Sequence, residues 1–290
     1  MDKMKNKRLF LLDMDGTLYL DDRLFPGAAE FLAKIQKSGG KYLFLTNNSS
    51  KGVDAYVEKM IRLGVPAAAE DFLTSVDALI VFLERTYGAA VKKKKMYVVG
   101  TRSFRAQLAA AGFLLTETPD DDTEILILGF DRELTYSKLE DACRLLMRGV
   151  QEPRTFGDAK AAAGLPAVDY YATNPEWVCP TAFGSVPDCG SMAWMLEKAT
   201  GRAPKFIGKP EPEMALLAME KFGFSPRETC LIGDRVYTDI ACGVNAGIDT
   251  IFVLSGEGVM TDIEKYHVQP TYCMQNIREV LNTLQKGEEK

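Results

Sequence analysis

The feature that most constrains the fold is a pair of aspartates that follows a short apolar run. Residues 9–12 are continuously apolar, and Asp13 and Asp15 come directly after them. Side chains of an extended chain alternate between two faces, so aspartates two residues apart point to the same side. A continuously apolar strand is typical of a buried place in a sheet, where uncompensated negative charge is costly. The natural compensation is a hard divalent cation that binds together with a phosphate group.

Alternating strand and helix patterns predict an α/β fold. Apolar residues at positions 28, 31, 32 and 35 are spaced as on one face of a helix, and an apolar run at residues 42–45 predicts the next strand. A second helical pattern covers residues 53–61, and the same alternation of strand and helix patterns returns after Gly201. Near-continuous apolar strands separated by helices favour a Rossmann-like parallel sheet that is covered by helices on both faces.

A second α/β unit is predicted inside the first. The middle of the chain has its own apolar runs at residues 96–99 and 125–128, then a helical pattern at about 137–147 and a loop-rich stretch that ends near Gly190. We therefore expect residues 1–80 and 186–290 to form the core. Residues 81–185 are expected to form an inserted α/β cap domain.

Composition and charge exclude several classes of protein. The net charge of −5 argues against a nucleic-acid-binding protein or a basic membrane-surface protein. No apolar run approaches the ~18 to 20 residues that a membrane span needs. The six cysteines are irregularly spaced and favour reduced thiols over a disulfide framework or a zinc site. We expect a cytoplasmic enzyme without nucleic-acid or membrane partners.

The single histidine, His267, narrows the chemistry further. A Ser-His-Asp triad or a histidine-rich zinc site would have to include it, and no nucleophile motif surrounds it. We interpret His267 as a surface residue. Catalysis is then expected to depend on carboxylates, lysine, hydroxyl groups and a metal ion.

Polar groups follow the predicted strands at several places along the chain. Ligands of open α/β sheets bind at the carboxyl ends of the strands. Each segment alone also fits an ordinary surface feature, such as a solvated turn, a helix cap or an exposed lysine. Their order and their shared place at strand ends favour one common site. The segments are residues 13–17, 46–48, 208–210 and 233–239.

These four segments resemble motifs I to IV of the haloacid dehalogenase superfamily. The first reads Asp-Met-Asp-Gly-Thr-Leu from Asp13, the second contains the strand-end Thr46, the third is Lys209 before proline, and the fourth reads Gly-Asp-Arg-Val-Tyr-Thr-Asp from Gly233. Similarity to the NagD-like subfamily, which carries a type 2 cap, rests on residues 46–49, 129–131, 134–136, 172–175 and 208–210. The resemblance spans nearly the whole chain.

The resemblance implies a Mg²⁺-dependent phosphatase that works through an aspartyl-phosphate. Asp13 would be the nucleophile, and Asp15 would protonate the leaving oxygen and then accept a proton from water. The implied catalytic residues are Asp13, Asp15, Thr46 and Lys209. The implied substrate-binding residues are Thr46, Asn47, Asn174 and Lys209. Mg²⁺ would be held by Asp13, the backbone carbonyl of Asp15, and Asp234, with Asp239 as support or as a further ligand.

The size of the electrostatic repulsion shows why the cation is needed. At an effective dielectric constant of about 20, two unit charges ~4 Å apart repel each other by about 4 kcal/mol. A phosphate dianion beside Asp13 would be repelled roughly twice as strongly. Mg²⁺ and Lys209 would supply the counter-charge.

The expected cap has its own role in this interpretation. It would cover the site, exclude bulk water and contact the leaving group. Asn174, Glu176 and Trp177 lie in a loop that could face the site, and a cap turn with a packed tryptophan explains them equally well. Glu176 stands where the subfamily pattern has aspartate, and residues 187–191 replace a more glycine-rich turn.

Several alternatives stay open from the sequence. The expected substrate is a small phosphorylated metabolite, and a nucleotide, a sugar phosphate, phosphoglycolate and an aryl phosphate all fit. A homodimer through the cap is one option for assembly. A phosphomutase or phosphotransferase of the same superfamily would share Asp13 and Asp15. A non-enzymatic phospho-acceptor signalling module is a weaker alternative, because it needs neither the fourth motif nor a large insertion.

Overall fold

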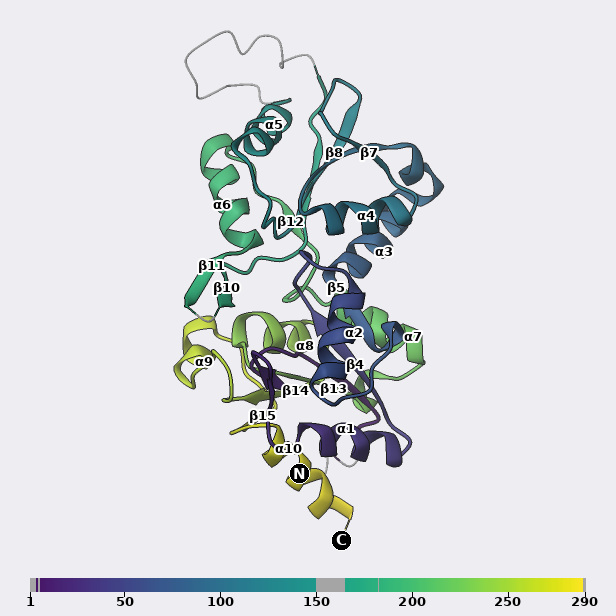
Figure 1. Ribbon diagram of the computed structural model, residues 1–290, viewed down its shortest axis with the longest axis vertical. Coiled ribbons are helices and arrows are strands. Elements are labelled where there is room, and N and C mark those ends of the chain that lie inside the picture. Colours follow the sequence, from purple (N-terminus) through teal and green to yellow (C-terminus); the bar gives the residue numbers. More distant parts are fainter. Residues whose placement is uncertain (1–3, 5, 150–164, 182, 289–290) are drawn as a thin grey trace. The chain divides into compact units, whose positions relative to one another are not determined.

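The computed structural model describes residue 4 and residues 6–149, 165–181 and 183–288. The chain forms two compact units, which we call the core and the cap (Figure 1). The core comprises Met1–Asn47, Val53–Thr74 and Gly208–Lys290, and the cap comprises Asn48–Gly52 and Ser75–Ile207.

The core is built on a six-stranded parallel sheet with the strand order β15-β14-β13-β1-β4-β5. Its central strand, β1, pairs with β13 on one side and with β4 on the other, so that Leu12 lies opposite both Ile232 and Phe44. The carboxyl ends of these three strands therefore meet at one edge of the sheet. The strands are β1 (Leu9–Leu12), β4 (Lys41–Thr46), β5 (Phe72–Thr74), β13 (Thr229–Gly233), β14 (Asp249–Val253) and β15 (Tyr272–Met274).

Helices cover the core sheet as the apolar spacing predicts. On α1 the residues at positions 28, 31, 32 and 35 are all buried. They pack in one cluster with residues of β1, α2 and α10, whereas α7 contacts β1 and β5. The helices are α1 (Ala28–Lys37), α2 (Val53–Arg62), α7 (Glu213–Phe222), α8 (Ala241–Asn245), α9 (Thr261–Tyr266) and α10 (Ile277–Glu288). A short hairpin, β2 (Tyr19–Leu20) with β3 (Arg23–Leu24), and a π-helical turn, Val236–Ile240, complete the described core elements that matter for the site.

The cap is a second parallel α/β unit. Its five strands run in the order β12-β9-β8-β6-β7, and α5 and α6 pack together with one face of this sheet. The strands are β6 (Lys95–Val99), β7 (Leu114–Thr116), β8 (Thr123–Leu128), β9 (Asp169–Ala172) and β12 (Lys205–Phe206). The helices are α3 (Ser75–Tyr87), α4 (Arg102–Ala110), α5 (Tyr136–Leu146) and α6 (Cys189–Thr200). An antiparallel hairpin joins β10 (Val178–Thr181) and β11 (Gly184–Pro187).

These two parallel sheets confirm the predicted fold class, an α/β core with an inserted α/β unit. Two details differ from the expectation. The stretch expected to be rich in loops contains β9 and the β10–β11 hairpin, and part of it, residues 150–164, lies outside the described residues. The short strand before Lys209, expected in the core, pairs with β9 in the cap. The domain boundaries near residues 81 and 186 stay a prediction; α6 and β12, at residues 189–206, pack within the cap unit.

In the described residues, no helix combines the length and the apolarity that crossing a membrane requires.

Candidate active site

A buried lysine lies between two carboxylates at the carboxyl edge of the core sheet. The Lys209 Nζ atom is 2.7 Å from Oδ1 of Asp13 and 2.6 Å from Oδ1 of Asp239. Only 1% of Lys209 is exposed. A buried ammonium is tolerated when it is paired and hydrogen bonded, and here both partners are carboxylates. The arrangement places a fixed positive charge next to Asp13, the first residue after β1.

The backbone of Lys209 is held by a side chain from the end of β4. Asn47 donates from Nδ2 to the Lys209 carbonyl at 2.8 Å, and its Oδ1 accepts a hydrogen bond from the Lys209 N–H at 2.9 Å. The Asn47 amide is therefore engaged with protein backbone. Its predicted contact with substrate would use its own backbone N–H and stays a prediction.

Three acidic side chains gather beside this lysine. Carboxylate oxygens of Asp13, Asp234 and Asp239 lie within 4.8 Å of one another. Asp234 follows β13, and its Oδ2 accepts a hydrogen bond from the backbone N–H of Glu257 at 2.7 Å. Asp239 lies on the π-helical turn, and its Oδ2 accepts from the Arg235 N–H at 3.0 Å. Three clustered carboxylate groups are a fitting donor set for a hard divalent cation such as Mg²⁺.

The electrostatics of the cluster also favour a cation. Burial, and next the neighbouring Asp239, raise the pKa of Asp13 well above its usual range, and the attraction of Lys209 only partly opposes this. Burial and Asp239 likewise raise the pKa of Asp234 to about 7. Both shifts mean that burial and the neighbouring carboxylate outweigh the attraction of the one lysine. A bound divalent cation would supply the missing charge.

Asp15 lies apart from this acidic cluster and has its own partners. Its Oδ2 accepts a hydrogen bond from the Tyr19 hydroxyl at 3.3 Å, and its Oδ1 lies 3.3 Å from Nζ of Lys59. The Asp15 side chain is 59% exposed, whereas that of Asp13 is 17% exposed. The two aspartates of the first motif, which are two residues apart, therefore occupy different electrostatic surroundings.

Glycine is required where the turn of the first motif passes close to the Asp234 side chain. Gly16 has φ of +85°, and a Cβ atom there would lie 2.5 Å from Oδ2 of Asp234. A Cβ atom on Gly256 would lie 2.0 Å from the same oxygen. The two backbones thus approach Asp234 more closely than any side chain would allow.

The remaining predicted residues lie in two places. Thr46 is buried at the end of β4, the strand next to β1. Asn174 belongs to the cap, where it is fully buried and its Oδ1 accepts a hydrogen bond from the Glu176 N–H at 3.0 Å. Trp177 is 52% exposed, so it is not the packed tryptophan of the alternative interpretation. The proposed roles of Thr46 and Asn174 stay predictions.

Sequence reasoning missed several residues around the site. Tyr19 and Lys59 contact Asp15, and the loop after β14 lies against Asp234 through Gly256 and Glu257. The loop had a usable signal, because Ser-Gly-Glu-Gly directly follows an apolar strand. Tyr19 and Lys59 had none, because they come from a hairpin and a helix whose packing the strand-end pattern does not describe.

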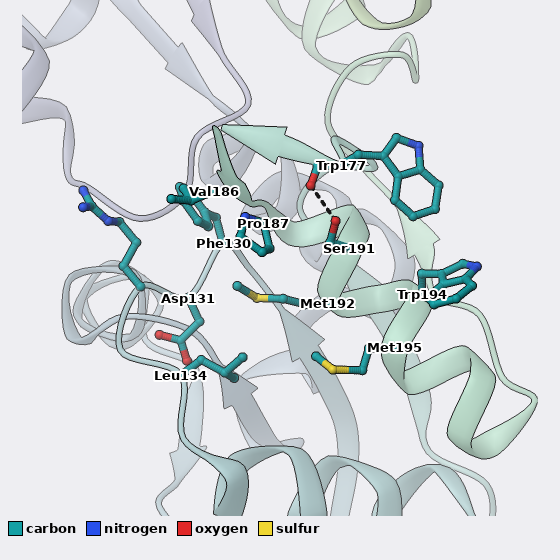
Figure 2. Close-up of a pocket in the computed structure, with 11 residues that line it drawn as sticks. Phe130, Asp131, Leu134, Trp177, Val186, Pro187, Ser191, Met192, Trp194 and Met195 are labelled. Atoms are coloured by element: carbon teal, nitrogen blue, oxygen red, sulfur yellow. Dashed lines mark hydrogen bonds between the residues drawn. The ribbon is translucent and has the colours of Figure 1, made fainter. Parts of the chain in front are cut away.

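The cap carries a groove of about 900 Å³ with mostly apolar walls (Figure 2). Trp177 and Trp194 flank it, and each is about half exposed. Met192 and Met195 project into it from α6. The other lining residues are Phe130, Asp131, Arg132, Leu134, Val186, Pro187 and Ser191.

Comparison with known proteins agrees with this geometry. A family model described as haloacid dehalogenase-like hydrolase matches residues 10–114, and a second, described as HAD-hydrolase-like, matches residues 206–280. The acid sugar phosphatase of Staphylococcus aureus is 31% identical over 284 residues, which cover 98% of this chain and 100% of that protein.

Solved structures give the same result. A 4-nitrophenylphosphatase from Thermotoga maritima is 35% identical, with a TM-score of 0.83 over 98% of this chain and 99% of the other. A glycerol phosphate phosphatase from Mycobacterium tuberculosis, solved in complex with magnesium, is 26% identical, with a TM-score of 0.79 over 95% of this chain and 77% of the other. The motifs, the two parallel sheets and these full-length matches together show that the chain belongs to the haloacid dehalogenase-like hydrolases, in their NagD-like subfamily.

Proposed function

We propose that this protein is a Mg²⁺-dependent phosphatase that hydrolyses monoesters of small phosphorylated metabolites. The observation that carries the proposal is the buried ion pair of Asp13 with Lys209, next to Asp234 and Asp239. This arrangement supports the proposed roles of these residues as a nucleophile, a fixed positive charge and a cation-binding set. Relatives named acid sugar phosphatase, glycerol phosphate phosphatase and 4-nitrophenylphosphatase support the same reaction.

The proposed reaction has two steps. In the first, a carboxylate oxygen of Asp13 attacks phosphorus, the bond from phosphorus to the ester oxygen breaks, and Asp15 gives its proton to that oxygen. In the second, Asp15 takes a proton from water, the water oxygen attacks phosphorus, and the bond from phosphorus to Asp13 breaks. The products are the free alcohol and inorganic phosphate, and both aspartates return to their starting states.

The other core residues have separate proposed roles. Lys209 faces Asp13 and would neutralise the phosphoryl oxygens that develop charge. The Thr46 hydroxyl and the backbone N–H of Asn47 would complete the phosphoryl site. Asp239 binds Lys209 Nζ and the Arg235 N–H, which supports a role in orienting the lysine.

The proposed magnesium site uses Asp13, Asp234 and the backbone carbonyl of Asp15, with Asp239 as support or as a further ligand. The carboxylate oxygens of the three buried or partly buried aspartates are close enough for one ion. When bound, Mg²⁺ would offset the negative charge of these residues and of the phosphate.

The direct test is the Asp13→Asn variant. It keeps the shape of the side chain and removes the nucleophilic carboxylate, so we expect no phosphate release above background from 4-nitrophenyl phosphate. Circular dichroism and thermal unfolding should show a folded protein. Phosphate release at the wild-type rate by this variant would rule out Asp13 as the nucleophile.

We further propose that the protein works in the cytoplasm. All six cysteines are free thiols, which is the state that a reducing compartment maintains. Acid added at lysis stops thiol exchange, and Ellman titration of the denatured protein, after the acid is neutralised, should then find six thiols. Four or fewer thiols would indicate disulfides and contradict this proposal.

For assembly we propose a homodimer in which the cap groove of one copy meets that of a second copy. Trp177, Trp194 and Met195 are large apolar side chains that line this groove and are each about half exposed, and exposed apolar side chains gathered in one groove are typical of an interaction surface. A symmetric dimer buries the same patch on both subunits. Sedimentation velocity should show a dimer for the native chain and a monomer for Trp194→Glu. A native chain that sediments as a monomer at micromolar concentration would contradict this assembly.

A further inference from the structure

We propose that Lys59, acting with Tyr19, positions the carboxyl group of Asp15 for proton transfer to the leaving oxygen. Lys59 would thus be a positioning residue, since it acts on the reaction through Asp15. The inference rests on the acid and base role of Asp15 in the proposed function. It adds a residue from α2, outside all four motifs, to the machinery of that reaction.

The contacts around Asp15 carry this inference. Lys59 Nζ lies 3.3 Å from Oδ1 of Asp15, and the Tyr19 hydroxyl lies 3.3 Å from Oδ2. Each carboxyl oxygen therefore has one donor of its own. Two contacts on two different oxygens fix both the direction of the side chain and the rotation of the carboxyl plane.

The two donors are themselves held in place. Tyr19 is fully buried, and its backbone carbonyl accepts a hydrogen bond from the Gly16 N–H at 2.8 Å. Lys59 Nζ lies 3.9 Å from the centroid of the Tyr19 ring, in a cation–π contact that restrains the long side chain. Burial and the nearby Asp15 raise the pKa of the Tyr19 hydroxyl, so it stays a donor at all relevant pH values.

An ordinary surface ion pair would not be arranged in this way. Such pairs join two mobile side chains and have little effect on stability. Here the Lys59 side chain is only 22% exposed, and its partner is 59% exposed. The lysine is the less exposed member of the pair, and the more exposed member is the group that must reach substrate. General acid catalysis requires the donor within hydrogen-bond reach of the leaving oxygen, so restricting Asp15 favours the reactive geometry.

A comparison of two leaving groups distinguishes positioning of Asp15 by Lys59 from a general attraction between Lys59 and the phosphate dianion. The alkoxide of glycerol phosphate is a poor leaving group and needs a proton from Asp15, whereas 4-nitrophenolate departs without one. The value of kcat/KM covers steps up to departure of the leaving group and omits the later attack of water. A residue that positions the acid should therefore affect kcat/KM for the alkyl ester much more than for the aryl ester.

The test compares these two substrates in Lys59→Met, which keeps the stem and removes the charge. We expect kcat/KM for glycerol phosphate to fall about tenfold or more, as part of the 10²- to 10⁴-fold that general acids typically contribute. For 4-nitrophenyl phosphate we expect a fall of no more than about threefold, because that ester gains little from the acid. Tyr19→Phe should show the same selective loss, and Lys59→Arg should restore most of the activity on glycerol phosphate.

Controls distinguish the ways in which the idea can fail. Arg62→Met removes an exposed cation from the same last turn of α2 and should leave both substrates unchanged. Equal loss for both esters in Lys59→Met would mean that the lysine attracts the phosphate dianion, and would overturn the positioning role. No loss in Lys59→Met, with glycerol phosphate hydrolysis abolished in Asp15→Asn, would refute the inference alone. Full activity of Asp15→Asn on glycerol phosphate would refute the acid assignment on which it rests.

Discussion

At the scale of single residues, the charge around Asp13 determines what the site can hold. Lys209 supplies one positive charge, whereas Asp13, Asp234 and Asp239 supply three carboxyl groups in the same small volume. Burial, and next the neighbouring carboxylate of Asp239, raises the pKa values of Asp13 and Asp234, and the attraction of Lys209 only partly opposes this. A proton and a divalent cation therefore compete for the same oxygens.

This competition predicts that Mg²⁺ affinity depends on pH. The pKa of Asp234 is about 7, so below that value the group is mostly protonated and a cation must displace the proton. We expect the affinity to weaken by about tenfold or more for each pH unit below 7, because the pKa of Asp13 is raised as well. Titration calorimetry at pH 5.5, 6.5 and 8 measures this directly. An affinity that is the same at all three values would contradict the raised pKa of Asp234.

The same shift has a consequence for stability in the absence of metal. The folded protein keeps a proton on Asp234 up to about pH 7, whereas the unfolded chain releases it near the ordinary value of 3.8. Because the folded state binds more protons in this window, the free energy of unfolding should decrease as the pH rises from about 4 to 7. Asp234→Asn should remove the part of this decrease that Asp234 causes. Saturating Mg²⁺ should make the decrease in the free energy of unfolding smaller.

The residues found from the sequence share a simple property. Asp13, Thr46, Lys209 and Asp234 follow predicted strands or precede a helix, so their places could be inferred from the order of elements. The partners of Asp15 could not be inferred in this way. Lys59 contacts Asp15 only because α2 packs beside the β2–β3 hairpin, and neither the helical spacing nor the charge of Lys59 indicates that contact.

At the scale of elements, most helices and strands follow from their apolar spacing. Helix α1 buries the four residues that the spacing indicates. The pattern fails where the element is polar or short: β9 begins with Asp169 and contains Tyr170 and Tyr171, so it does not resemble a continuous apolar strand. On α2 the spacing included Ile61, which is 57% exposed, because the helix buries a narrower face around Tyr56 and Met60.

The turn after β1 gives a prediction at this scale. Gly16→Ala adds a Cβ atom 2.5 Å from Oδ2 of Asp234 at a φ of +85°. We expect unfolding to become easier by more than the roughly 1 kcal/mol that a left-handed backbone conformation alone costs a residue with a side chain. We also expect Mg²⁺ binding to weaken at least tenfold, because Asp234 must move away.

A matched control separates the two effects at Gly16. Gly39 also has a positive φ, +72°, and a Cβ atom there meets nothing within 4 Å. Gly39→Ala should therefore show the backbone cost alone, with unchanged Mg²⁺ affinity. Urea unfolding and calorimetry on the two variants make the comparison. Equal effects of both substitutions on Mg²⁺ binding would show that crowding of Asp234 is not the cause.

At the scale of the whole molecule, the charged residues of the proposed site belong to one of the two units. Every side chain of the acidic cluster, together with Lys209, belongs to the core. The cap contributes none of the cation donors among the described residues, and it has a parallel sheet and an apolar core of its own. The order of elements could predict an insertion, but not where β12 pairs, because a two-residue strand has no distinctive spacing.

This division predicts how Mg²⁺ acts on local stability. Ions that bind only the folded core should slow backbone exchange there, around Asp13, at the π-helical turn Val236–Ile240 and in the loop that holds Gly256. Exchange in β6, β8 and α5 of the cap should not change, since no donor comes from them. Hydrogen–deuterium exchange with and without Mg²⁺ measures both sets of peptides in one experiment. In Asp234→Asn the core effect should disappear at the same Mg²⁺ concentration, because one of three clustered carboxylates is lost. Protection of cap peptides equal to that of the core would mean that the cap takes part in binding the ion.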